Sequence, residues 1–138
     1  MTLDWTAGKH YPFVIHLHHA KRAGLHYDVR IRNDSYRLTD FATRKNPTDM
    51  KHGDKIVLFQ QPDHTLTWLT KEGQIVSGYG AGSVKIWDEG TANIIRATGN
   101  HAIINFFGNK LNGCFSLVNF KPKEYLLIKI KNQNCVHK

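Results

Sequence analysis

The sequence has little of what marks secreted and membrane proteins. Its 138 residues include two cysteines, Cys114 and Cys135, which are too few for a disulfide framework, and we expect both to be free thiols in a cytoplasmic protein. It contains no apolar run of about 18 residues, the length that a transmembrane helix needs. Residues 1–5 lack the basic and then apolar pattern of a signal peptide, so we expect no such leader.

Acidic residues are also scarce, since 11 aspartates and glutamates stand against 19 lysines and arginines. The formal net charge of +8 draws a small protein to polyanions, because neutralising phosphates releases bound counterions. Nucleic acid is therefore the expected partner, although a surplus of charge that serves only solubility gives the same composition. The histidine count of 9 is more than a core needs and favours metal binding or proton transfer.

Long helical periodicity is missing, and short apolar stretches recur at intervals of about ten residues, which favours a mainly β sandwich or barrel. We expect one compact domain at 13–131, preceded by a short arm at 1–12 and followed by a polar tail at 132–138. Expected strands are Phe13–His18, His26–Ile31, Ser35–Thr39, Ile56–Gln60, Leu66–Leu69, Ser83–Trp87, Asn93–Thr98, His101–Phe106, Gly113–Asn119 and Tyr125–Lys129. Turns are expected at 88–90 and 108–110, and loops at 46–47 and 62–63.

The stretch from Phe13 to Ile31 carries the densest chemical signal. On a strand, His26, Asp28 and Arg30 share one face, because alternate side chains point the same way. A polar sheet surface with an Asp–Arg pair of little energetic value would show the same pattern. The preceding strand argues for more than that, because His16 and His18 also share a polar face there.

If these two strands pair as a hairpin, His18, His26 and Asp28 converge. Two imidazoles and one carboxylate suit Mn²⁺, Zn²⁺ or Fe²⁺ and leave open positions for water and substrate. Arg30, beside the metal, would hold a phosphate oxygen through two parallel hydrogen bonds. His16 is either a fourth ligand or a residue that contacts and orients the ligands without binding the metal itself.

This stretch resembles the signature of the 3′-phosphoesterase module of bacterial DNA ligase D and its stand-alone relatives. The similarity continues in order through the chain, and an ordered set of motifs is stronger than any single one. The further matching segments are Phe41–Pro47, Asp63-His64 with Leu66, Glu72-Gly73, Gly78–Gly82, Val84–Thr91, Leu111–Gly113, Leu117-Val118 and Tyr125–Lys129.

The resemblance implies a compact single-domain β-barrel with a polar, crescent-shaped active-site groove. It also implies a Mn²⁺-dependent enzyme, with Zn²⁺ or Co²⁺ as other candidates, that removes a 3′-terminal ribonucleoside and then the remaining 3′-phosphate from DNA. Carried over by position, the metal ligands are His18, His26 and Asp28. Arg30 and His64 would complete the catalytic set. The residues expected to bind phosphate or DNA are Arg30, Lys45, Lys55, His64 and Trp68.

Some positions depart from the family pattern. Trp68 stands where the family has a functional tyrosine, and indole can stack on a base but has no phenolic hydroxyl. Ile56, next to Lys55, replaces an arginine, and the arm before Phe13 is short. The family has glutamine at His16, which favours the supporting role. These replacements leave fewer groups that can bind phosphate in the pocket. We therefore expect phosphodiesterase activity without efficient removal of a 3′-phosphate.

Two other functions are alternatives to the phosphoesterase. One is a catalytically weakened DNA-end-binding or ligase-associated module of the same fold. The other is a cupin-like small-molecule metalloenzyme, which the absence of an acidic residue after His18 disfavours. The expected partners are DNA 3′ ends and, beyond them, a DNA ligase or a Ku-like end-binding protein. We expect a monomer that has no membrane association.

Overall fold

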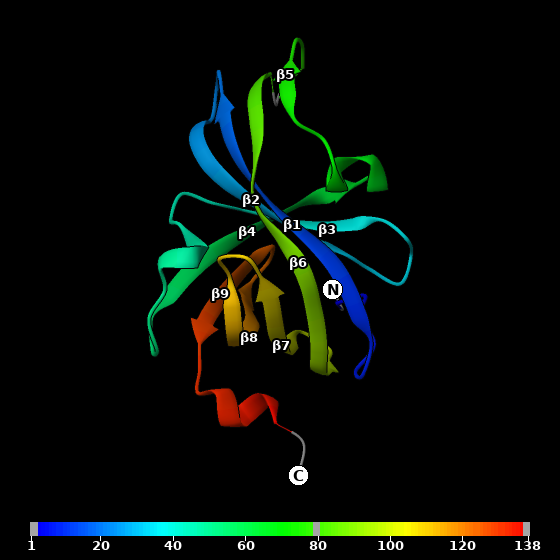
Figure 1. Ribbon diagram of the computed structural model, residues 1–138, viewed down its shortest axis with the longest axis vertical. Helices are drawn as coiled ribbons and strands as arrows, with labels where there is room; N and C mark the ends of the chain where they lie inside the picture. Colours follow the sequence, from blue (N-terminus) through cyan, green and yellow to red (C-terminus); the bar gives the residue numbers. More distant parts are fainter. Residues whose placement is uncertain (1–2, 79–80, 137–138) are drawn as a thin grey trace.

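The computed structural model describes residues 3–78 and 81–136, and most of them lie in β-strands (Figure 1). The strands are β1 His10–Ala20, β2 Gly24–Arg32, β3 Leu38–Thr43, β4 Lys55–His64, β5 Gly73–Ile75, β6 Gly82–Thr98, β7 His101–Gly108, β8 Asn112–Lys121 and β9 Glu124–Lys129. Short 3₁₀ helices are η1 Pro47–Asp49, η2 Leu66–Leu69 and η3 Asn132–Cys135. None of the described helices is long and apolar enough to cross a membrane.

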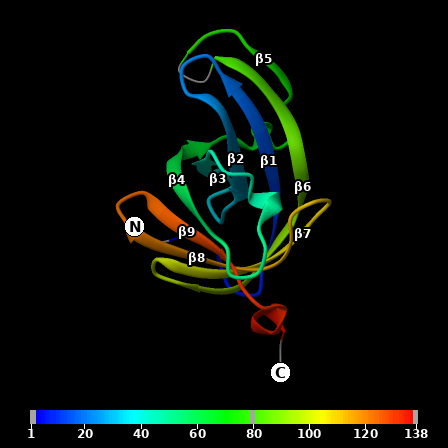
Figure 2. The ribbon, with the colours of Figure 1, turned by 90° about the vertical axis from the view of Figure 1, so that its left-hand side faces the viewer.

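The strands close into a barrel. In the described chain the order is β1-β2-β3-β4-β9-β8-β7-β6, and β6 then pairs with β1, so that eight antiparallel strands form a ring. The short strand β5 adds to the free edge of β6. This closure confirms the predicted β-barrel and removes the exposed edges that an open sheet would present. Figures 1 and 2 show the β1–β2 hairpin and the adjoining end of β6 projecting away from the C-terminus.

Alternation along β1 and β2 separates an apolar face from a polar one. Phe13 and Ile15 of β1, with Val29 and Ile31 of β2, belong to the buried hydrophobic core. Phe106 packs edge-to-face on Phe13 at 5.1 Å between ring centroids, the geometry that aromatic pairs prefer. The intervening residues of both strands lie on the opposite face, which is where the candidate functional side chains gather.

The predicted pairing of the first two strands is confirmed. In the β1–β2 register His16 lies opposite Asp28, and His18 lies opposite His26. Gly24 adopts a left-handed φ of 78°, which glycine reaches without steric cost, and this lets the chain turn back into β2.

Two predicted strands are one strand in the structure. Ser83–Trp87 and Asn93–Thr98 both belong to β6, and the turn expected at 88–90 lies inside it. The polar Asp88 serves another purpose, because its carboxylate accepts backbone N–H bonds from Asn109, Lys110 and Leu111. Asp88 therefore holds the β7–β8 turn, which was correctly expected at 108–110.

Three further local predictions are wrong. Leu66–Leu69 is the helix η2 and not a strand. The loop expected at 62–63 lies within β4, where the register with β3 shifts, and an irregularity of this kind tolerates proline in a sheet. The strand expected at Ser35–Thr39 begins only at Leu38, because Tyr36 turns the chain with a φ of 57°.

The expectation of free thiols is also wrong, because Cys114 of β8 and Cys135 of η3 form a disulfide. The tail folds back as a short helix that contacts β8, and this brings together two cysteines separated by 21 residues. The two cysteines therefore give no support to the cytoplasmic location expected from the sequence.

Replacing Cys135 with serine is expected to lower the free energy of unfolding by about 3 kcal/mol, because the loop between the cysteines would gain conformational entropy in the unfolded chain. Urea unfolding of both proteins under oxidising conditions measures the difference. Addition of a reductant should bring the parent protein to the stability of the variant. Equal stability of the two oxidised proteins would contradict this expectation.

Candidate metal centre

The polar face of β1 and β2 places four candidate functional side chains next to one another. His16 and His18 come from β1, Asp28 and Arg30 come from β2, and all four are at most 5% exposed. Buried charged groups are costly unless they are paired or bind an ion. This cluster therefore needs partners, and the distances within it show what they are.

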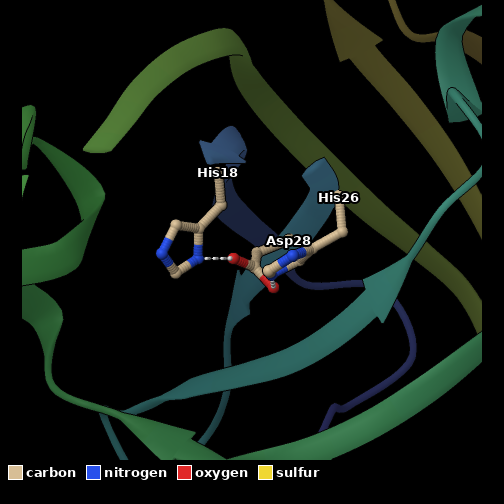
Figure 3. Close-up of side chains that lie close together, drawn as sticks. All are labelled: His18, His26 and Asp28. Carbon is tan, nitrogen blue, oxygen red and sulfur yellow. Dashed lines mark hydrogen bonds and ion pairs between the residues drawn. The ribbon is translucent and has the colours of Figure 1, made fainter. Parts of the chain in front are cut away.

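Asp28 lies between the two histidines (Figure 3). Its Oδ2 is 3.1 Å from Nδ1 of His18, and its Oδ1 is 3.2 Å from Nε2 of His26. Ligand atoms of the three side chains lie within 4.8 Å of one another, so one divalent cation can be reached from all three. The structure thus brings together His18, His26 and Asp28 as the sequence predicts.

The chemistry of this donor set fits a transition-metal ion. Burial alone would raise the pKa of Asp28, but its contacts with His18, His26 and Arg30 hold the pKa of the carboxyl well below its usual range. The hydrogen bond to Asp28 raises the pKa of His26 despite partial burial of the ring. Nδ1 of His26 donates to the carbonyl oxygen of Gly24 at 3.2 Å, which directs Nε2 towards the cluster.

Arg30 lies next to the cluster and is held from several sides. Its Nη1 donates to Nδ1 of His16 at 2.6 Å, and its Nη2 lies 3.3 Å from Oδ2 of Asp28. The guanidinium lies over the ring of Trp68, 4.6 Å from the centroid, at a distance typical of a cation–π contact. These contacts fix the orientation of a cation that is 2% exposed.

His16 supports Arg30 and lies outside the cluster of ligand atoms. Burial and the charge of Arg30 lower the pKa of His16 to about 4, so the ring is neutral near neutral pH. Because Nδ1 accepts from Arg30, Nε2 carries the proton and donates to the carbonyl oxygen of Lys71 at 2.8 Å. His16 thus links the polar face of β1 and β2 to the segment that follows η2.

His64 and Trp68 approach the same place from the end of β4 and from η2. Nδ1 of His64 is 3.0 Å from Oδ2 of Asp40 and 3.1 Å from the carbonyl oxygen of Pro62. The rings of His64 and Trp68 pack edge-to-face at 5.2 Å. Trp68 is also 4.6 Å from the ammonium group of Lys71.

Asp40 of β3 is a part of the site that the sequence prediction missed. It is 1% exposed, and its Oδ1 lies 3.4 Å from Nε of Arg30. Burial raises the pKa of Asp40, so its negative charge depends on the cations around it. The β2–β3 register puts Asp40 directly opposite Arg30, and a strand predicted at its true position would have revealed the pair.

A cavity of about 840 Å³ opens onto these groups. Its wall contains most of the residues expected from the sequence, namely His18, His26, Asp28, Arg30, Lys45, Lys55 and His64. Trp68 is not among the lining residues and contacts the wall through Arg30 and His64. The lining also includes apolar side chains such as Ile56 and Phe59, which are suited to contact a nucleobase.

The barrel and its polar groove therefore match the architecture that the motifs led us to expect. Residues 16–119 match the family of the DNA ligase D 3′-phosphoesterase domain, and the chain belongs to this family. The expectation from the motifs is confirmed.

Relatives with assigned names include the "multifunctional non-homologous end joining protein LigD" of Mycobacterium bovis, which is 37% identical over 127 residues, or 88% of this chain. The protein of that name in Mycolicibacterium smegmatis is 32% identical over 138 residues, or 91% of this chain. The alignments cover 16% and 18% of these two relatives, so the chain corresponds to a small part of their length.

Proposed function

We propose that this protein is a metal-dependent phosphoesterase that processes the 3′ ends of DNA. It removes 3′-terminal ribonucleosides, 3′-phosphates or both, and leaves ends fit for repair and ligation. The observation that carries the proposal is the convergence of His18, His26 and Asp28 beside Arg30 at the wall of one cavity. The family supports a phosphoester as the substrate, and the net charge of +8 supports a polyanion.

In the proposed hydrolysis, different residues of the cavity have different roles. His18, His26 and Asp28 would hold Mn²⁺, which supplies Lewis-acid activation of water and of the phosphoryl group when bound. Arg30 binds a non-bridging phosphate oxygen, and its fixed orientation requires little reorganisation during the reaction. His64 donates a proton to the leaving oxygen.

The flanking residues bind the nucleic acid. Lys45 and Lys55 add positive charge to the wall of the cavity and attract the phosphate backbone. Trp68 supports Arg30 and His64 and stacks on a base where its ring is accessible. A DNA ligase or an end-binding protein would bring the enzyme to broken ends.

The decisive experiment uses a 5′-labelled DNA duplex whose primer strand ends in one ribonucleotide. Metal-stripped protein is incubated with this substrate and Mn²⁺, and the products are separated on a denaturing gel beside those of His18→Ala. A shorter product made only by the parent protein supports the proposal. Absence of cleavage with Mn²⁺, Zn²⁺ and Co²⁺, together with a retained gel shift, favours the binding module that has lost its chemistry.

The two activities are expected to differ in rate. We expect removal of a 3′-phosphate to be at least about tenfold slower than removal of a terminal ribonucleoside, because a monoester carries one more charge. Ile56 supplies no cation to balance it, and the loss of one charge-assisted contact costs about 1.4 kcal/mol or more. Time courses on the two substrates at equal concentration measure the ratio. Equal rates would contradict the expectation.

A matched variant tests the physical reason. Ile56 is half-buried in the wall of the cavity, so Ile56→Arg would place a guanidinium there. This change is expected to speed removal of the 3′-phosphate relative to the diester, and Ile56→Met is the control that adds length without charge. A faster reaction in both variants would mean that charge is not the limiting property.

A further inference from the structure

Asp40 is a buried carboxylate in the cavity wall to which the proposed mechanism gives no role. It touches two of the groups that act on the substrate, with Oδ1 at 3.4 Å from Arg30 and Oδ2 at 3.0 Å from His64. Both of its partners are cations or can become cations, so one carboxylate connects two separate parts of the site. Burying a carboxylate costs desolvation free energy, so we expect its contacts to serve the site.

The contacts of His64 fix which ring nitrogen carries a proton. Nδ1 faces Asp40 at 3.0 Å and the carbonyl oxygen of Pro62 at 3.1 Å. A carbonyl oxygen can only accept, so Nδ1 must be the donor in this arrangement. The nitrogen left to exchange a proton with substrate is Nε2, on a ring that lines the cavity.

We propose that Asp40 is a positioning residue that keeps a proton on Nδ1 of His64, so that the second proton of the doubly protonated ring lies on Nε2, from which it is donated to the departing nucleoside. This role rests on the proposed function. It makes Asp40 the residue through which His64 becomes an effective general acid. In the step, water forms a bond to phosphorus and releases a proton to solvent. The bond from phosphorus to the 5′ oxygen of the terminal nucleoside breaks, and that oxygen takes the proton from Nε2 of His64. Solvent then returns a proton to His64.

The variant Asp40→Asn keeps the shape of the side chain and removes its charge. Its amide nitrogen can turn towards His64 and favour the wrong tautomer, as happens when the acid of a catalytic triad is changed in this way. We expect kcat for the oxygen-linked substrate to fall by about 100- to 1000-fold, with KM within about threefold. Asp63→Asn is the control, because Asp63 precedes His64 in β4 and binds Asn33.

A second substrate separates proton donation from every other effect. It links the terminal nucleoside through a 5′ sulfur, which leaves as a thiolate and needs no proton donor. On this substrate Asp40→Asn and His64→Gln should react at rates within about fivefold of the parent protein, whereas both are slow on the oxygen-linked substrate. Arg30→Lys should be slow on both, because the phosphate still needs its bidentate partner.

Each result has a defined meaning. Rescue of Asp40→Asn by sulfur, matching the rescue of His64→Gln, supports the proposal. Slow cleavage of both substrates would show that Asp40 acts through Arg30 and overturns it, and so would parent-like rates on both. If the parent protein cleaves neither substrate, the proposed function fails first, and the role of Asp40 falls with it.

The unaltered protein provides a measurement that does not depend on folding of a variant. Nitrogen-15 correlation spectra of its histidine rings should show a proton on Nδ1 of His64, because Nδ1 lies 3.0 Å from the carboxylate of Asp40, which is 1% exposed. A proton on Nε2 with a bare Nδ1 would overturn the proposal. Assignment uses His64→Gln, in which the signal is lost.

Discussion

Replacing Asp28 with asparagine is expected to slow cleavage of a ribonucleotide-ended primer by about 1000-fold or more and to weaken Mn²⁺ binding strongly. Asp28 is the one charged member of the proposed ligand set, and it bridges His18 and His26. An asparagine of the same shape has no negative charge, and its amide nitrogen is a donor where a metal needs an acceptor.

Isothermal titration of metal-free protein with Mn²⁺ measures the loss of binding, and the primer assay measures the loss of activity. Asp49→Asn is the matched control, because Asp49 is exposed in η1 and the exchange removes the same charge. Unchanged Mn²⁺ binding and unchanged activity of Asp28→Asn would place the metal elsewhere. Unchanged binding with lost activity would mean that Asp28 acts on the substrate and not on the ion.

Replacing Arg30 with leucine is expected to destabilise the metal-free protein by about 3–5 kcal/mol. Its guanidinium faces Asp28 at 3.3 Å and Asp40 at 3.4 Å, and both carboxylates are almost fully buried. Leucine fills part of the space but leaves two buried acids near each other without their cation. The loss of stability comes mainly from leaving buried carboxylates without the guanidinium, and it is larger than the net stabilisation that the ion pairs provide.

Urea unfolding near pH 7 with a chelator present gives the free energies. Arg22→Leu is the control, because Arg22 is exposed at the tip of the β1–β2 hairpin and a surface change there should stay within about 0.5 kcal/mol. Adding Asp40→Asn to Arg30→Leu should recover part of the loss, since it removes one of the two buried carboxylates that lose the guanidinium. Similar stability of Arg30→Leu and Arg22→Leu would mean that the carboxylates are neutral or solvated.

The part of the site that could be predicted is the part built from local sequence. His18, His26 and Asp28 lie on two adjoining strands, and their period-2 spacing already places them on one face. Asp40 could not be found in this way, because its contacts depend on where β3 begins. Tyr36 delays that strand by a left-handed turn, which the local propensities did not reveal.

Long-range pairing explains the other differences. Cys114 and Cys135 meet only because η3 folds back on β8. The local sequence around each cysteine does not predict this contact. The turn expected within β6 had the right residues, but Asp88 uses its carboxylate to hold another turn of the chain. The helix η2 carries Trp68 to Arg30 and His64, and a strand would have presented the indole in another direction.

The double pairing of β1 has a consequence for the order in which the protein folds. On one edge β1 pairs with its neighbour in sequence, and on the other it must wait for β6, which follows much later in the chain. Local pairs close small loops and form early, whereas distant pairs cost more chain entropy. During synthesis, the three proposed metal ligands can therefore meet on the hairpin while the strands that close the barrel are still being made.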